Sequence, residues 1–192
     1  MLPADLHSEA ICDFLADRVG QATRLRLATA ADSEFILGLR LDSARSTHIS
    51  VTSASLSDQL KWMSDYEARF KAGLEAYFII QHEGKDVGTV RIYDYRPAAD
   101  SFCWGSWIIQ QGVSERAAFA TPLVVYDLGF DCLGFAAAHF DIRQENVSVW
   151  KFEEMMGAEL INEDELNRMY SYSKSKYPAA RARLLRLTGI TS

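Results

Sequence analysis

The sequence has little positive charge, few cysteines and no long hydrophobic run. Its 20 lysines and arginines are outnumbered by 26 aspartates and glutamates, and the formal net charge of −6 disfavours a nucleic-acid binder, whose binding face would be basic. The three cysteines are odd in number and form no Cys-x-x-Cys pair, which predicts reduced thiols in apolar surroundings rather than disulfides or a metal site. The longest apolar stretch, 117–138, contains two aspartates, a proline and two glycines, so we do not expect it to span a membrane.

No secretory signal is predicted, because Asp5, His7 and Glu9 interrupt the apolar region that such a signal needs. Together with the reduced cysteines, this predicts a cytoplasmic protein. The length of 192 residues and the lack of internal repeats or low-complexity linkers favour a single domain over 21–192, preceded by a helical extension over 1–20. The extension is expected to pack on the domain or on a partner subunit, so a homodimer remains open.

The stretch 102–158 carries the strongest pattern in the chain. It predicts a strand, a loop, a helix, a second strand and a second helix, with the regular elements over 102–110, 123–133, 137–142 and 145–156. The first strand is rich in aromatic and β-branched side chains, and the first helix is apolar nearly all round, with Asp127 and Asp131 at its surface. Gly157 ends the second helix. The two strands are expected to be parallel and joined by a right-handed crossover.

The sequence allows two N-terminal caps for the helix predicted over 123–133. If Ser114 caps it, Pro122 lies inside the helix. If Thr121 caps it, Pro122 takes the first helical position, which proline favours.

The rest of the chain predicts a mixed sheet. The expected strands cover 23–29, 76–81, 87–95, 158–161 and 169–173, and the expected helices cover 4–18, 30–41, about 55–71 and 177–187. The polar segment 42–56 is expected to be a loop between two helices. The fold class is therefore α/β, with a sheet that is antiparallel in its first half and parallel in its middle.

In this order the segments resemble the GNAT superfamily of acyl-CoA-dependent N-acetyltransferases over about 23–175. The hairpin YFIIQHEGKDVGTVRIYD resembles the second and third strands of that family, and GSWII its fourth strand. Residues 115–120 stand where the family has its Arg/Gln-x-x-Gly-x-Gly/Ala motif, and Asn146 precedes Gly157 at the spacing of its next helix. The branch that looks closest contains ribosomal-protein N-terminal acetyltransferases and amino-sugar acetyltransferases. The resemblance implies an α/β (α+β) fold with splayed parallel central strands, helices on both faces, acetyl-CoA as cosubstrate and no metal.

Several positions depart from the family pattern. The leading Arg/Gln position of the motif holds Glu115, with Arg116 one place later, and Ala118 replaces the first glycine. Cys103 stands where many members have a glutamate base, and Glu153 where many have a tyrosine acid.

The loop that enters the helix after 114 suits a pyrophosphate, because backbone N–H groups and the helix dipole both favour an anion. Its small residues allow close approach, although an ordinary buried helix has the same signature. Gly105 predicts a bulge in its strand, beside which the resemblance places pantetheine. The predicted cofactor-binding residues are Trp107, Ile108, Ile109, Glu115, Arg116, Ala117, Ala118, Phe119, Ala120, Thr121, Asn146 and Phe152.

The predicted catalytic residues are Asp141, Ser106 and Glu153, because amine acetylation needs a proton acceptor and a donor for the leaving thiolate. Asp141 shares a strand face with His139, which we interpret as a satisfied core histidine. For Glu153, a solvated helix residue is the alternative interpretation.

The predicted substrate-binding residues are Arg40, Arg45, His48 and Trp62, in and around the loop 42–56. Their cationic and aromatic groups suit a small amine acceptor such as a nucleotide-linked amino sugar. A protein N-terminus as acceptor and a non-catalytic acyl-CoA-binding domain remain as alternatives, the latter because the usual glutamate and tyrosine are absent.

Overall fold

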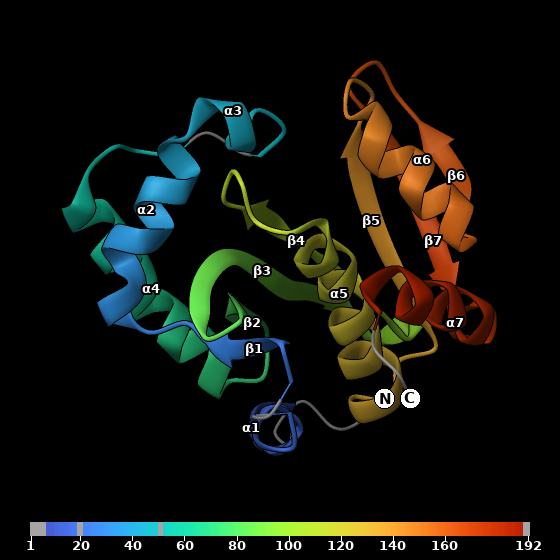
Figure 1. Ribbon diagram of the computed structural model, residues 1–192, viewed down its shortest axis with the longest axis horizontal. Coiled ribbons are helices and arrows are strands. Elements are labelled where there is room, and N and C mark those ends of the chain that lie inside the picture. The colour runs from blue at the N-terminus through green and yellow to red at the C-terminus, as the bar shows by residue number, and fades with distance from the viewer. Residues whose placement is uncertain (1–6, 19–20, 50–51, 190–192) are drawn as a thin grey trace.

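The computed structural model describes residues 7–18, 21–49 and 52–189 and shows a mixed seven-stranded sheet in the order β1-β2-β3-β4-β5-β7-β6 (Figure 1). The β4–β5 pair is parallel and the other five neighbouring pairs are antiparallel, which confirms the predicted mixed sheet. The strands are β1 (Thr23–Leu27), β2 (Ala76–His82), β3 (Lys85–Arg96), β4 (Ser101–Ile109), β5 (Ala137–Arg143), β6 (Glu159–Glu163) and β7 (Asn167–Ser173).

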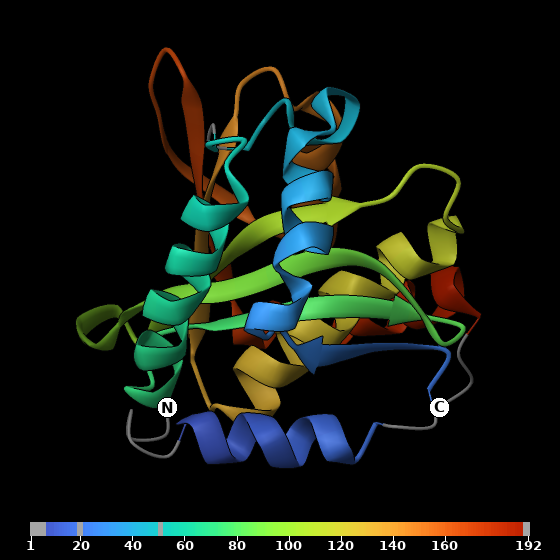
Figure 2. The same cartoon turned by 90° about the vertical axis from the view of Figure 1, so that its left-hand side faces the viewer.

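Helices cover both faces of the sheet, as predicted. Helices α2 and α4 lie on one face, and α5, α6 and α7 lie on the other, as the two perpendicular views show (Figures 1 and 2). Among the helices that the structure describes, none is long and apolar enough to cross a membrane. The helices are α1 (His7–Ala16), α2 (Ser33–Leu41), α3 (Ser43–Ser46), α4 (Leu56–Lys71), α5 (Glu115–Tyr126), α6 (Val147–Met156) and α7 (Tyr177–Thr188).

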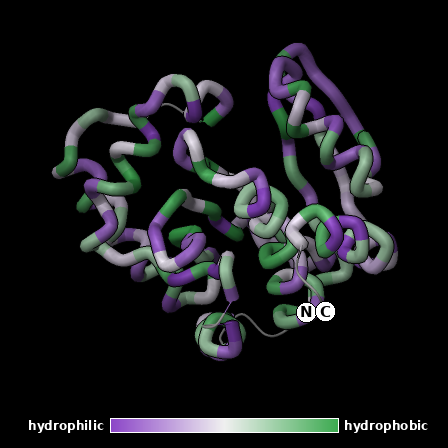
Figure 3. Tube along the Cα trace, in the orientation of Figure 1, coloured by the Kyte–Doolittle hydropathy of each residue, from purple (hydrophilic) through white to green (hydrophobic). Residues whose placement is uncertain are grey.

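Hydrophobic residues concentrate on the central strands and on α5, where the main core lies (Figure 3). The described part of the N-terminal extension belongs to this core, because Ile11 and Phe14 of α1 are buried in it. The extension therefore packs on its own domain; residues 1–6 and 19–20 of the predicted extension lie outside the described residues.

Of the three cysteines, Cys103 is buried and Cys132 half-buried, but Cys12 is exposed on α1, which corrects its expected apolar surroundings.

Helix α5 begins earlier than the apolar pattern predicts. The side chain of Ser114 accepts a hydrogen bond from the N–H of Arg116, so Ser114 is the cap and Pro122 lies inside the helix. A π-helical segment, Asp127–Cys132, continues the helix. Asp127 is buried rather than at the surface, because α7 covers it and supplies hydrogen bonds from Tyr177 (2.5 Å) and Arg181 (2.9 Å).

The segment 42–56 is not entirely a loop. Its beginning forms the short helix α3, which Asp42 caps by accepting a hydrogen bond from the N–H of Ala44 at 3.0 Å. Residues 50–51 of this segment lie outside the described residues. Helix α4 then begins after Ser55, whose side chain accepts a hydrogen bond from the N–H of Asp58, close to the predicted start at about residue 55.

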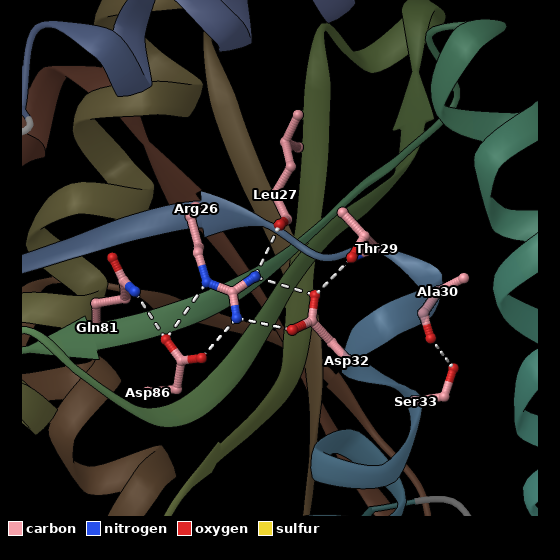
Figure 4. Close-up of polar contacts among 8 residues, drawn as sticks. All are labelled: Arg26, Leu27, Thr29, Ala30, Asp32, Ser33, Gln81 and Asp86. Atoms are coloured by element: carbon pink, nitrogen blue, oxygen red, sulfur yellow. Dashed lines mark hydrogen bonds and ion pairs between the residues drawn. The ribbon is translucent and has the colours of Figure 1, made fainter.

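A charge network fixes the turn from β1 into α2 against the β2–β3 hairpin (Figure 4). The Arg26 guanidinium donates to Asp32 (2.7 and 3.0 Å) and to Asp86 (2.6 and 3.3 Å). Burial alone would raise the pKa of Asp32, but hydrogen bonds from Arg26 and Thr29 lower it below its usual value. The hydrogen bonds from Arg26 and Gln81 likewise lower the pKa of Asp86.

Replacing Arg26 with methionine should destabilise the fold by about 1–2 kcal/mol at pH 7, since the site is partly exposed. Both carboxyl groups have a lower pKa in the folded state. Their contribution is therefore present above the unfolded-state pKa and is lost as the pH falls through the folded-state pKa. The difference in unfolding free energy between wild type and Arg26→Met, measured by urea titration, should shrink between pH 5 and pH 3. Lys71→Ala, in an exposed pair with Glu67, is the control, and an equal pH dependence in both variants would contradict the assignment.

Candidate active site

A bulge interrupts β4 at the centre of the sheet. Thr89 of β3 is opposite Ile108, and Arg91 is opposite Gly105, so β4 has one residue more than β3 between these pairs. The extra residue is accommodated at Ser106, which has a left-handed backbone (φ +50°) and whose carbonyl accepts a hydrogen bond from Thr89 Oγ1 at 3.1 Å. The predicted bulge is present, but the left-handed residue is Ser106 rather than Gly105.

Gly105 has a different role beside the bulge. A Cβ atom at this position would lie 3.1 Å from the hydroxyl oxygen of Tyr93, so glycine lets this side chain of β3 lie across β4. Burial raises the pKa of Tyr93 above its ordinary value, and the nearby Cys103 and Asp141 raise it further. Tyr93 therefore keeps its proton at neutral pH.

The parallel strands separate just beyond their pairing. Residue pairing between β4 and β5 covers Ser101–Ala137 and Phe102–Ala138. Above these pairs the two strands border a cavity of about 760 Å³, a size that suits a cofactor or ligand. The splayed central strands that the resemblance implied are thus present.

More than half of the predicted catalytic, cofactor-binding and substrate-binding residues line this larger cavity. Among the residues predicted from the sequence they are Ser106, Trp107, Ile108, Ile109, Ala118, Asp141, Asn146, Glu153, Arg45 and His48. They come from α3 and the residues just after it, and from β4, α5, β5 and α6 with its cap, which lie far apart in the chain. Asn146 occupies the cap position of α6 without making a side-chain capping bond, and its amide is thus available to a ligand.

A smaller cavity of about 400 Å³ adjoins the first between α2, α4 and the sheet. The predicted residues Arg40 and Trp62 border it, together with Asp58 and Gln59. Ser106 and Arg91 border both cavities. The bulge in β4 is therefore the place where the two cavities meet.

Other predicted cofactor residues do not border either cavity. The side chains of Ala117, Ala120 and Thr121 are fully buried in the core side of α5. Phe119 is half-buried against Phe152 of α6, with ring centroids 6.2 Å apart. Glu115 and Arg116 are exposed in the first turn of α5. In that turn the N–H of Arg116 donates to Ser114 Oγ at 3.3 Å and the N–H of Ala117 donates to the Ser114 carbonyl at 2.9 Å.

Glu153 is the most perturbed acid of the larger cavity. It is 1% exposed and is not a solvated helix residue. Its Oε2 accepts a hydrogen bond from the Tyr126 hydroxyl at 2.9 Å. Burial raises the pKa of Glu153 to about 8, against the smaller opposing effect of that hydrogen bond, so the carboxyl group is protonated at neutral pH.

Two other titratable groups, His139 and Cys103, are poorly suited to accept a proton. His139 is held by Ser101 at Nδ1 (2.8 Å) and by Asp94 at Nε2 (3.0 Å), which confirms the interpretation of a satisfied histidine. Burial raises the pKa of the Cys103 thiol to about 11, so Cys103 is a poor base. Within the described ranges, no group of three or more His, Cys, Asp or Glu side chains could hold a metal ion.

Comparison with known proteins agrees with this geometry. No family model matches the chain, and no curated protein sequence does either. Among solved structures, FdhC in its apo form, a nucleotide-linked sugar GNAT, has a TM-score of 0.79 and 39% identity, covering 88% of this chain and 96% of its own.

Two more distant structures share the fold alone. RimJ from Mycobacterium smegmatis, in complex with CoA-disulfide, has a TM-score of 0.72 at 16% identity, over 87% of this chain and 89% of its own. A mutant of the spermidine N-acetyltransferase SpeG from Vibrio cholerae has a TM-score of 0.67 at 15% identity, over 81% of this chain and 96% of its own. With 39% identity to FdhC across nearly the whole of both chains, this protein belongs to the GNAT superfamily of N-acetyltransferases.

Proposed function

We propose that this enzyme transfers the acetyl group of acetyl-CoA to the primary amine of a nucleotide-linked amino sugar. The main support is that two cavities of different character meet at Ser106. The larger one, between β4 and β5, suits an extended donor, and the smaller one, with Arg40 and Arg91 at its border, suits an anionic acceptor. The acceptor described for FdhC, a nucleotide-linked sugar, supports the same class.

The residues of the larger cavity fit coenzyme A. The N-terminal end of α5 would hold the pyrophosphate by the helix dipole, and Ala118 leaves room for it. Trp107, Ile108 and Ile109 would hold the pantetheine, because the edge of β4 that faces the cavity has no paired strand there. When bound, acetyl-CoA supplies the thioester carbonyl carbon and a thiolate leaving group.

The chain's own groups would then handle the protons. The acceptor nitrogen attacks the thioester carbon, so a C–N bond forms, the C–S bond breaks and the amine loses a proton. Asp141, exposed in the cavity, would take that proton directly or through water. Glu153, which is protonated at neutral pH, would give a proton to the sulfur, and backbone N–H groups of the bulge would donate to the carbonyl oxygen.

Asp141→Asn should lower kcat by about 10- to 100-fold, because asparagine cannot accept the proton. The affinity for coenzyme A should change little, since Asp141 lies on β5, away from the first turn of α5. Cys103→Ala is the matched control on β4, and its kcat should stay within about threefold of wild type because the thiol is a poor base. Steady-state kinetics for both variants check this, and a larger loss for Cys103→Ala would reverse the assignment.

A coenzyme A-release assay over three acceptor sets tests the function itself. The sets are nucleotide-linked amino sugars, the same amino sugars without the nucleotide, and peptides with a free N-terminus. The proposal expects turnover of the first set. Turnover of peptides alone would favour a protein N-terminal acetyltransferase, and coenzyme A binding without any turnover would favour a non-catalytic domain.

A further inference from the structure

Arg91 occupies a position that the sequence did not single out. It lies in the middle of β3, directly opposite Gly105 and thus next to the bulge in β4. It borders both cavities, which otherwise share Ser106. A cation at this position faces any acceptor that reaches the bulge from the smaller cavity.

The guanidinium is held by stacking more than by ion pairing. Its carbon lies 4.1 Å from the centroid of the Tyr93 ring and 5.8 Å from that of Trp62. Glu75 is 3.6 Å away at Nη1, but the same carboxylate receives a closer hydrogen bond from Arg69 at 2.8 Å. The charge of Arg91 is therefore only partly balanced by the protein.

One donor of this side chain is also unused. Nε of Arg91 is buried and has no hydrogen-bond partner among the described residues. A buried donor without a partner is costly and uncommon, and it points to a group that is supplied from outside the chain. The guanidinium plane presents paired donors that match the oxygens of a phosphate.

We propose that Arg91 binds the diphosphate of the acceptor and so selects nucleotide-linked amino sugars over free ones. This inference rests on the proposed function. The smaller cavity supports it, because Arg40 and Arg91 outnumber the single carboxylate at its border, Asp58, in a protein whose net charge is −6. Stacking on Tyr93 keeps the guanidinium in place before the ligand arrives, which lowers the entropic cost of binding.

Binding of nucleoside diphosphates tests the role of Arg91 without any turnover. The donor site is first saturated with coenzyme A, and UDP and dTDP are then titrated by calorimetry. Wild type should bind at least one of the two, and Arg91→Ala should weaken that binding at least tenfold. Arg91→Lys should restore part of the affinity, because it keeps the charge but loses the paired donors.

A further arginine variant serves as a control. Arg96→Ala lies on the same strand outside both cavities and should bind the diphosphate like wild type. Coenzyme A affinity and the circular dichroism spectrum should be unchanged in every Arg91 variant, which separates lost binding from lost folding. The inference is overturned if wild type binds neither diphosphate, if Arg91→Ala binds as wild type does, or if Arg45→Ala loses the binding instead.

Kinetics separate this inference from the proposed function. If wild type acetylates a nucleotide-linked amino sugar and Arg91→Ala leaves its KM unchanged, the role of Arg91 is wrong while the function stands. If the diphosphate binds through Arg91 and no nucleotide-linked sugar is acetylated, the function is wrong while the anion site stands.

Discussion

Replacing Glu153 with glutamine should stabilise the fold increasingly as the pH rises from 5 to 8. The carboxyl group has a pKa of about 8 in the folded state and an ordinary value of 4.5 when exposed. Between these values the folded protein keeps a proton that the unfolded chain has released, so the stability of the wild type falls as the pH rises. The full shift corresponds to up to roughly 5 kcal/mol, at about 1.4 kcal/mol per pH unit. Glutamine is neutral at every pH in this range, so the Glu153→Gln variant does not lose stability in this way.

Urea unfolding of the two proteins at pH 5, 6.5 and 8 measures the effect. The hydrogen bond from Tyr126 lowers the pKa of Glu153, so in Tyr126→Phe the loss of stability should continue to higher pH than in wild type. Glu145→Gln, at an exposed position just before α6, is the matched control for the substitution. Parallel pH profiles for wild type and Glu153→Gln would show that the glutamate is ionised in the folded protein.

The same variant also tests the proposed chemistry. A glutamine cannot give a proton to the thiolate, so Glu153→Gln should combine greater stability above pH 6 with lower kcat. In the wild type, kcat should decline above about pH 8 as the carboxyl group ionises. A gain in stability without a loss of turnover would mean that Glu153 is a buried structural acid and that water protonates the sulfur.

Local patterns predicted the seven strands and every helix except α3, in the observed order. The alternation on either side of Glu83 and Gly84 predicted the β2–β3 hairpin, and Gly157 marked the end of α6 correctly, because each signal lies within or next to the element that it specifies. Gly105, a glycine inside a strand pattern, then predicted the bulge. This pattern could not show that Ser106 takes the left-handed conformation, since Gly105 is the residue that adopts it at lower cost.

Long-range contacts account for the features that the sequence missed. Asp127 was predicted to lie at the surface because its hydrogen-bond partner Tyr177 lies 50 positions later in the chain. Arg91 and Tyr93 alternate along β3 as in any half-buried strand, and nothing local shows that their face meets the splay of β4 and β5. The separation of those strands is a property of the whole sheet, so the residues around it could be found only once the topology was known.

Replacing Ala118 of α5 with aspartate should strongly weaken the binding of coenzyme A. Ala118 borders the larger cavity one turn into α5, at the end where the helix dipole favours an anion. A carboxylate there would face the pyrophosphate, and like charges placed together at a binding site cost several kcal/mol. We therefore expect the dissociation constant for coenzyme A, measured by calorimetry, to rise by at least about 100-fold.

Ala118→Asn separates charge from size in this experiment, because asparagine has nearly the same shape without the charge. It should bind coenzyme A much more tightly than Ala118→Asp, and raising the salt concentration should narrow the gap, since salt screens the repulsion at this partly exposed position. Both substitutions cost a similar, small amount of helix propensity, so their unfolding curves should be close. Equal coenzyme A affinities for the two variants would place the pyrophosphate away from the first turn of α5 and would require another donor-binding surface along β4 and β5.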